Sequence, residues 1–250
     1  MTLKSQRLKL TIAYDGAPFA GWQSQSHHNT IQDHLELAFK RIEGRSVRVH
    51  GSGRTDAGVH ALAQCAHVDV SNNRLPPAQW MAALNALLPP AIRVLRSQSV
   101  SKNFHARFSA KGKLYRYRIW SAPVLPPLEY GRAWHLIASL DFQIIKSGAA
   151  QFTGTHDFAG FAANRGRRET DTVRTLHSVK VRRHGACLTL DFEADGFLYK
   201  MVRLMVGTLT QCATGKATCK DIANILDRQL HHKARLVAPA AGLFLIRVQY

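Results

Sequence analysis

The segment from Gly51 to His60, GSGRTDAGVH, places an arginine and a carboxylate in a glycine-rich loop. Arg54 stands two residues before Asp56 and adds positive potential beside it. An ionised carboxylate in such a loop serves as a nucleophile or as a general base. An aspartate before Ala-Gly is also a common turn residue, and the local sequence by itself favours that simpler role. Asp56 is therefore a catalytic candidate that depends on what other elements place beside it.

A second candidate lies in the apolar segment FLYKMVRLMVGTL, residues 197–209. Apolar residues cover nearly the whole circumference of a helix over this stretch, which is typical of a buried helix. Arg203 stands in its middle, and an unpaired buried cation is costly. Its side chain either reaches the surface on its aliphatic stem or pairs with a distant carboxylate. At about 4 Å and an effective dielectric constant near 20, such a pair attracts by roughly 4 kcal/mol before desolvation, which would keep a partly buried aspartate ionised.

Aromatic and basic residues alternate in NFHARFSAKGKLYRYRIW, residues 103–120. Cations grip phosphate and rings stack on unpaired bases, so the pattern favours RNA binding, with Phe104, His105 and Arg107 as candidate contacts. On the strand expected over 113–120, Tyr115 and Tyr117 share one face and the arginines lie on the other. A strand with an aromatic core face and a solvated basic face would show the same pattern.

The charge balance is strongly basic. The 250 residues include 34 Lys+Arg against 16 Asp+Glu, a formal charge of +18, and the isoelectric point is about 10.4. Such an excess favours a nucleic-acid partner, although a basic protein without such a partner would have the same composition. The basic residues are spread through core-like segments, so we expect the basic surface to belong to the fold itself.

Cysteine and histidine usage points to a cytoplasmic protein without a metal site. The four cysteines, Cys65, Cys187, Cys212 and Cys219, form no CxxC pair, and the thirteen histidines show no HExxH or zinc-finger spacing. The first residues lack the apolar core of a signal peptide, and no 18-residue apolar run occurs. We therefore expect reduced thiols, no membrane association and a cytoplasmic location.

Periodicity predicts strands and helices in similar numbers in the two halves of the chain. Strands are expected over 8–14, 46–50, 64–70, 91–100, 113–120, 172–183, 186–194 and 242–250. Helices are expected from Ile31, with Asn29 or Thr30 as cap, after Pro76-Pro77, and over 141–152, 196–212 and 220–230. Prolines at 123, 126 and 127 mark the expected boundary between two domains, 1–120 and 121–250. The pattern predicts an α+β fold of two related lobes, the first carrying the Asp56 loop and the second the Arg203 helix.

Five motifs, in the same order, resemble the tRNA pseudouridine synthase A family: YDGAPFAGWQ from Tyr14, GRTDAGVHA from Gly53, FHARFSA with the following YRY, FLYKMVR from Phe197, and the final APAAGLFLIRVQY. The resemblance implies an isomerase, an intramolecular transferase that converts uridine to pseudouridine at positions 38, 39 and 40 in the anticodon stem-loop of tRNA. It implies two similar α/β lobes with joined antiparallel and mixed sheets and a central basic active cleft. It also implies a homodimer in which one tRNA contacts both subunits, and no metal or organic cofactor.

The resemblance also implies roles for individual residues. Asp56 would be the catalytic aspartate, Arg203 would pair with it, and Tyr115 would pack against the target uracil. Arg54 would help to hold the RNA backbone or the flipped nucleotide. The sequence does not decide whether Asp56 attacks C1′, attacks C6 or acts as a base, which tRNAs are modified, or which RNA contacts residues 160–172 make.

Three other functions share parts of this pattern. A non-catalytic RNA-binding protein on the same scaffold would share the charge and the aromatics but would not need Asp56 together with Arg203. A hydrolase with an aspartate nucleophile would usually show a DxD pattern, which is absent around Asp56. A related synthase that modifies other uridines would differ mainly in how it measures the shape of the RNA.

Overall fold

Alternating burial along the first strand shows how the sequence builds the sheet. The computed structural model of the chain describes residues 5–26, 28–71, 75–163, 170–227 and 230–250. In β1 (Gln6–Tyr14), Leu8, Leu10, Ile12 and Tyr14 are buried and the residues between them are not. This period of two is that of a strand with one face toward a core. The strand predicted over 8–14 is confirmed.

The described chain forms two compact units, residues 1–111 with 245–250, and residues 112–244. We predicted a division after residue 120. The strand over 112–120 instead packs within the second unit, and the last six residues of the chain belong to the first. Pro123, Pro126 and Pro127 lie in the connection that follows β5 (Gly112–Trp120) inside the second unit. They interrupt regular structure there but do not mark a boundary between the units.

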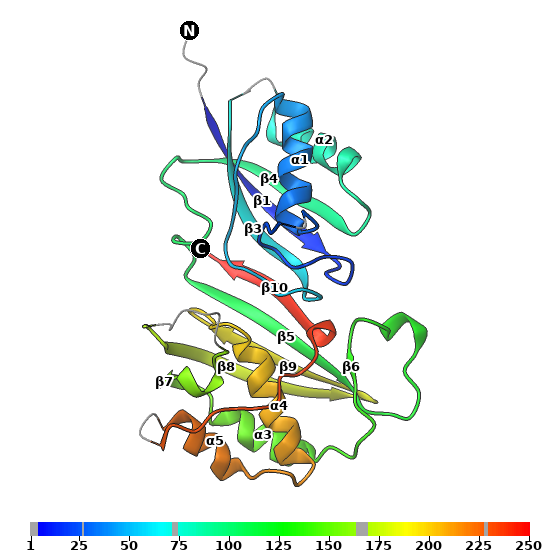
Figure 1. Cartoon of the computed structure of the whole chain (residues 1–250), viewed down its shortest axis with the longest axis vertical. Coiled ribbons are helices and arrows are strands. Elements are labelled where there is room, and N and C mark those ends of the chain that lie inside the picture. The colour runs from blue at the N-terminus through cyan, green and yellow to red at the C-terminus, as the bar shows by residue number, and fades with distance from the viewer. Residues whose placement is uncertain (1–4, 27, 72–74, 164–169, 228–229) are drawn as a thin grey trace. The chain divides into compact units, whose positions relative to one another are not determined.

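The first unit holds strands and two helices (Figure 1). Its strands run in the order β4 (Ile92–Val100), β1, β3 (His60–Val70) and β10 (Leu243–Gln249), and β2 (Val49–Gly51) also pairs with β3. The pairs β1–β3, β1–β4 and β2–β3 are antiparallel. Helices α1 (Ile31–Glu43) and α2 (Pro77–Leu87) contact each other through Phe39 and Trp80, whose ring centroids are 5.5 Å apart. Both rings are buried and form the centre of this core.

Helix α1 begins and ends at residues with clear capping chemistry. Thr30 is the N-cap and forms a reciprocal capping box with Asp33, while Gly44 adopts a left-handed φ of 74° at the C-cap. Such a box satisfies two backbone N–H groups that have no partner inside the helix. The helix predicted from Ile31 is confirmed, and Thr30 rather than Asn29 caps it.

The strands of the second unit run in the order β5, β9 (Cys187–Ala194), β8 (Val173–His184) and β7 (Gly154–Asp157). These pairs are antiparallel, and the short β6 (Trp134–His135) pairs with β5 in parallel. Helices α3 (Phe142–Ala150), α4 (Met201–Ala213) and α5 (Cys219–Leu226) contact one another, with α3 against β8 and α4 against β5. The predicted α+β fold class is confirmed.

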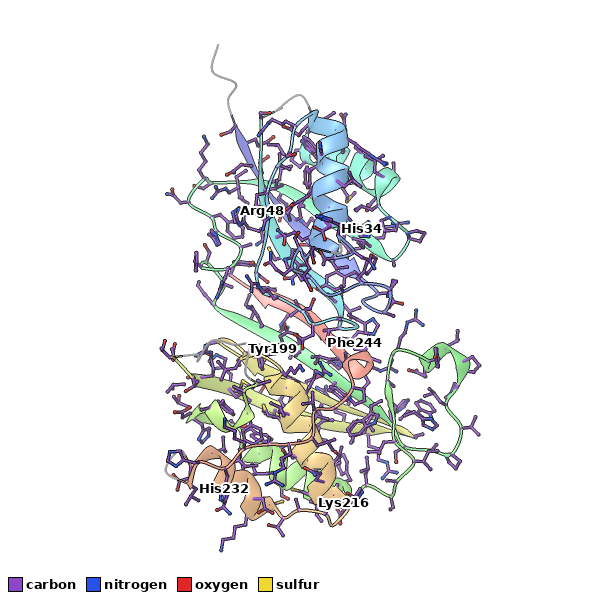
Figure 2. All side chains as sticks on the ribbon, in the orientation of Figure 1. His34, Arg48, Tyr199, Lys216, His232 and Phe244 are labelled. Atoms are coloured by element: carbon purple, nitrogen blue, oxygen red, sulfur yellow. The ribbon has the colours of Figure 1, made fainter. Side chains whose placement is uncertain are left out.

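The helix that carries Arg203 is buried, as predicted, but it begins later than predicted. Eleven of the thirteen residues of α4 are buried, and Arg203 and Gln211 are the two that are not. Residues 196–200, predicted as helical, form an irregular segment and a turn in which Tyr199, labelled in Figure 2, precedes Lys200. Lys200 has a left-handed φ of 59°, which breaks the helical path that the apolar pattern suggested.

Gly207 lets the backbone at Leu236 pass close to helix α4. A Cβ at this position would overlap the carbonyl oxygen of Leu236. The Gly207→Ala substitution should therefore lower the free energy of unfolding by about 1–3 kcal/mol, as overpacked cores do, although alanine is otherwise the better helix former by about 1 kcal/mol. Urea unfolding measures this change. Gln211→Ala on the same helix is the control, and stabilisation by Gly207→Ala would contradict the close approach.

Candidate active site

The Asp56 loop spans residues 52–59 between β2 and β3 and is held at both ends. Ser52 is buried, and its hydroxyl donates to Gln64 Oε1 at 2.6 Å. Gln64 Nε2 in turn donates to the carbonyl of Gly53 at 3.0 Å. After Asp56 the chain turns, with Val59 N–H donating to the Asp56 carbonyl at 3.2 Å. The local sequence therefore does make a bend, as its simpler interpretation predicted, and the bend is anchored to strand β3.

Gly21 brings the segment 14–23 against the backbone of this loop. It has a left-handed φ of 92°, and a Cβ there would lie 2.7 Å from the carbonyl oxygen of Thr55 and 3.0 Å from the carbonyl carbon of Asp56. Trp22 N–H donates to the same Thr55 carbonyl at 3.0 Å. Only glycine fits such a close approach with this backbone conformation. The position of Asp56 is thus set by a segment some 35 residues earlier in the chain.

Thr55 is fixed through its side chain as well. Its hydroxyl and the buried hydroxyl of Tyr14 form a hydrogen bond of 2.8 Å. Burial raises the pKa of Tyr14 to about 12, so its phenol stays protonated and neutral. Thr55 is buried, Asp56 is half-buried and Arg54 is exposed. The loop is therefore anchored at Thr55, and the charged residues Arg54 and Asp56 on either side of it in the sequence are more exposed.

Arg203 lies in the first turn of α4 and is tied to the segment after Leu236. Its Nε donates to the carbonyl of Ala238 at 2.7 Å, and Ala238 N–H donates to the Arg203 carbonyl at 3.0 Å. The next residue, Pro239, accepts a 2.7 Å hydrogen bond from Tyr117 of β5. This arrangement joins the motifs FLYKMVR, YRY and APAAG within the second unit. The guanidinium is held by its Nε, which fixes the direction of its terminal amino groups.

Tyr115 lies on the core face of β5, as predicted from alternation. It is 8% exposed, and its ring meets that of Phe197 edge-on with centroids 5.0 Å apart. Tyr117 and Ile119 on the same face are fully buried. Two of the predicted site residues, Tyr115 and Arg203, therefore lie in the second unit. Tyr115 packs against Phe197, just before α4, and Arg203 donates to Ala238, after α4.

The arginines on the other face of β5 are held by carboxylates. Arg116 makes a two-pronged contact to Asp191 at 2.7 and 2.8 Å, and Arg182 contacts the same carboxylate at 2.9 Å. Burial opposes ionisation of Asp191, but these hydrogen bonds outweigh it and lower the pKa of the carboxyl. Arg118 pairs with Glu129 at 2.8 Å. For this strand, the aromatic core face and basic outer face account for the alternating sequence without RNA.

Phe104, His105 and Arg107 lie together in a loop of the first unit. Phe104 and His105 are half-buried, and Arg107 is exposed. The ring of Phe104 packs against Tyr250, with centroids 4.9 Å apart. The His105 ring meets the edge of His67 at 4.6 Å. Two of the three predicted RNA-binding side chains therefore also hold the loop on its own sheet.

His67 is the main anchor of this loop. It is 2% exposed, and its Nδ1 accepts a hydrogen bond from Ala106 N–H at 3.1 Å. Burial lowers the pKa of His67 to about 4, and the positive charges of His105, His50 and Arg7 act in the same direction, whereas Asp69 opposes them. A neutral imidazole is required, because a protonated Nδ1 cannot accept the Ala106 bond.

Sequence reasoning missed the residues that position the loops. Tyr14, Gly21 and Thr55 set the Asp56 loop, and Ala238 and Tyr117 set the Arg203 segment. The two glycines in YDGAPFAGWQ, Gly16 and Gly21, are the available signal, because a glycine between large residues can mark a close backbone approach. Among the described residues, no group of three or more metal-ligating side chains occurs, and none of the helices described is long and apolar enough to cross a membrane.

The sequence has close counterparts among characterised families. The family model described as tRNA pseudouridine synthase matches residues 10–109 and 149–250. A tRNA pseudouridine synthase A of Akkermansia muciniphila is 45% identical over 98% of this chain and 95% of its own length. One of Acetivibrio thermocellus is 40% identical over 98% of this chain and all of its own. Among solved structures, a chain in the crystal structure of a Cbf5-Nop10-Gar1 complex has 14% identity and a TM-score of 0.38, over 95% of this chain and 48% of that one, too low to add to the sequence matches.

Stability should fall in mildly acidic solution because of His67. Its unfolded pKa is about 6.5 and its folded pKa is about 4, so the unfolded chain binds the proton more tightly. The contribution is complete above about pH 6.5 and is lost as the pH falls toward 4. It amounts to about 3 kcal/mol, because one pKa unit corresponds to about 1.4 kcal/mol. Urea unfolding between pH 7 and 4.5 should show a shallower dependence for His67→Asn than for the wild type or for the exposed control His184→Asn. An unchanged slope in His67→Asn would contradict this assignment.

Proposed function

Because the chain belongs to the tRNA pseudouridine synthase family, we propose that it isomerises uridine to pseudouridine in tRNA, at positions 38, 39 and 40 of the anticodon stem-loop. The observation that carries the proposal is the family match over both segments that hold the candidate site, the Asp56 loop and the Arg203 helix. The formal charge of +18 supports a polyanionic substrate. The targeted positions rest on the motif resemblance.

The proposed reaction rearranges one nucleotide without any redox change. The N1–C1′ bond of uridine breaks, the base turns within the pocket, and C5 forms a bond to C1′. C5 then loses its proton, and N1 takes one up, so the product is an isomer of the substrate. The target base must first leave its stack, which costs a few kcal/mol. Contacts from basic side chains to phosphate and from rings to bases offset that cost.

Asp56 is the proposed catalytic carboxylate. It acts as a nucleophile toward C1′, as a base that removes the C2′ proton, or as a nucleophile toward C6 of the ring, and each of these roles requires the ionised form. The anchoring of Thr55 by Tyr14 and by the Trp22 N–H supports a fixed position for this carboxylate. Preorganised groups lower the cost of reaching the transition state. Arg54, exposed on the same loop, is proposed to hold the RNA backbone or the flipped nucleotide.

Arg203 is the proposed partner of Asp56. This pairing rests on the motif resemblance, and the hydrogen bond from its Nε to the Ala238 carbonyl supports a fixed guanidinium. A guanidinium at about 4 Å attracts a carboxylate by roughly 4 kcal/mol at an effective dielectric constant of 20. Tyr115 is proposed to pack against the target uracil. We also propose a cytoplasmic homodimer in which one tRNA contacts both subunits.

Asp56→Asn should fold and bind tRNA but make no pseudouridine, because the amide cannot act as a nucleophile or a base. We expect a loss of turnover of at least about 10³-fold, as for other essential catalytic residues. Tritium release from tRNA labelled at uridine C5 measures turnover, and fluorescence anisotropy measures binding. Asp195→Asn, an exposed carboxylate that accepts from Thr175 N–H, is the matched control. Product above background in Asp56→Asn would defeat the catalytic assignment.

The targeted positions need a separate measurement. Pseudouridine mapping of total tRNA from a strain without the gene should show uridine at positions 38, 39 and 40 and no change elsewhere. Loss of pseudouridine at other positions would favour a synthase with other targets. Wild-type protein that binds unmodified tRNA without forming any product would favour the non-catalytic alternative.

Arg203→Ala should reduce both turnover and stability. Loss of the guanidinium leaves the carbonyl of the buried Ala238 without this donor, and an unsatisfied buried acceptor typically costs about 1–3 kcal/mol. Arg203→Lys should recover part of the stability, since it keeps the charge, but little of the turnover, because lysine cannot hold both the Ala238 carbonyl and the carboxylate. Arg182→Ala on β8 is the control for losing an arginine from the second unit. Turnover at the wild-type rate in Arg203→Ala would remove the ion-pair proposal.

A further inference from the structure

The loop over residues 101–111 carries one aromatic ring that faces solvent. Phe108 is 78% exposed, whereas Phe104 in the same loop is half-buried. The Phe108 ring is stacked on His105, with centroids 4.3 Å apart and planes 29° apart. One face of the phenyl ring is thus covered by imidazole. A large apolar ring held in this way at the surface indicates an interaction site more strongly than a single scattered exposed residue does.

Hydrogen bonds fix the turn that presents Phe108. Nδ1 of His105 accepts from the backbone N–H groups of Arg107 and Phe108 at 3.1 and 3.2 Å. Ser109 N–H donates to the His105 carbonyl at 2.9 Å, and the Ser109 hydroxyl accepts from His105 N–H at 3.0 Å. The imidazole therefore caps its own turn and supports the phenyl ring above it. The ring is preorganised, which reduces the entropy cost of binding a partner.

The base of the turn is anchored to the sheet on two sides. Ala106 donates to His67 Nδ1 at 3.1 Å and accepts from the Tyr250 hydroxyl at 2.8 Å. Arg7 donates to the Phe104 carbonyl at 2.8 Å. Phe108 is therefore exposed on a turn that hydrogen bonds hold in place, and not on a loosely held loop.

The surroundings of the ring are positive. The guanidinium of Arg107 lies 5.8 Å from the centroid of the Phe108 ring, and Arg107, Lys102 and Lys111 are exposed. No acidic residue occurs between Ser101 and Lys111. An exposed ring flanked by cations matches a base joined to a phosphate, because rings stack on bases and cations bind phosphates.

We propose that Phe108, supported by His105, is a stacking platform for one unpaired base of the RNA substrate, with Arg107 on an adjacent phosphate. The occupant is a base outside a helix, since a paired and stacked base does not expose its face to a side chain. The identity of the RNA as a tRNA anticodon arm rests on the proposed function. The platform itself rests on the geometry of residues 105–109.

Binding of a labelled anticodon stem-loop hairpin, followed by anisotropy at fixed salt, tests the platform. Phe108→Ala should raise Kd about 5- to 150-fold, which corresponds to the 1–3 kcal/mol typical of base–aromatic stacking. Phe108→Trp should bind at least as tightly as the wild type. Leu37→Ala, which truncates another exposed apolar side chain of the first unit, should leave Kd unchanged. Circular dichroism confirms folding of each variant.

A series of hairpins with one abasic loop nucleotide each locates the stacked base. One abasic position should weaken binding by the wild type and have no effect on Phe108→Ala, whereas the other positions should affect both proteins alike. Arg107→Ala should lower the slope of log Kd against log salt by about one. Equal Kd values for Phe108→Ala and the wild type, or a loss that is the same for a fully paired duplex, would overturn the platform and favour a protein partner for the ring.

This experiment is independent of the proposed activity. If the wild type makes no pseudouridine but the abasic signature is present, the platform stands and the proposed function fails. If pseudouridine is made and no abasic position is linked to Phe108, the function stands and the platform fails.

Discussion

The close backbone approach between Gly21 and the Thr55–Asp56 peptide is the constraint on which the first unit depends. A side chain at position 21 would have to occupy the space of the Thr55 carbonyl. The same carbonyl accepts from Trp22, and the Thr55 hydroxyl meets Tyr14 in the core. The loop is therefore fixed through Thr55, while Arg54 is exposed and Asp56 is half-buried. A rigid support of this kind is what a positioned carboxylate requires.

In the second unit, several arginines are held by carboxylates or by a backbone carbonyl. Arg116 and Arg182 share the carboxylate of Asp191, Arg118 pairs with Glu129, and Arg203 donates to a backbone carbonyl. These cations contribute to the shape of the sheet and of the first turn of α4. Net charge alone therefore overstates how much of the chain is available to RNA, and the exposed cations of loops such as 101–111 are the better candidates.

Local patterns predicted most of the secondary structure, and the deviations have physical causes. Alternation in β1 and the capping residues of α1 act within a few residues, so they are visible in the sequence. The start of α4 is not, because the apolar run from Phe197 continues through a turn that depends on the left-handed Lys200. The Asp56 and Arg203 candidates came from residue type and motif. Gly21 supports the Asp56 loop and Ala238 supports Arg203, and in each case the two segments are about 35 residues apart in the sequence. A local periodicity cannot predict contacts at such a separation. The same holds for the strand over 112–120, which belongs to the second unit and pairs with β9 from Lys113 to Trp120.

Residues 245–250 belong to the unit that residues 1–111 form, although 133 residues that form the other unit separate them. On the ribosome, the amino-terminal sheet must therefore wait for the whole intervening unit to emerge before Tyr250 can contact Ala106 and Phe104. Until then the turn bearing Phe108 lacks the hydrogen bond from Tyr250, while the contacts from His67 and Arg7 can already form. The last contact that holds this turn therefore forms late in synthesis, after the hydrogen bonds that His105 and His67 already provide.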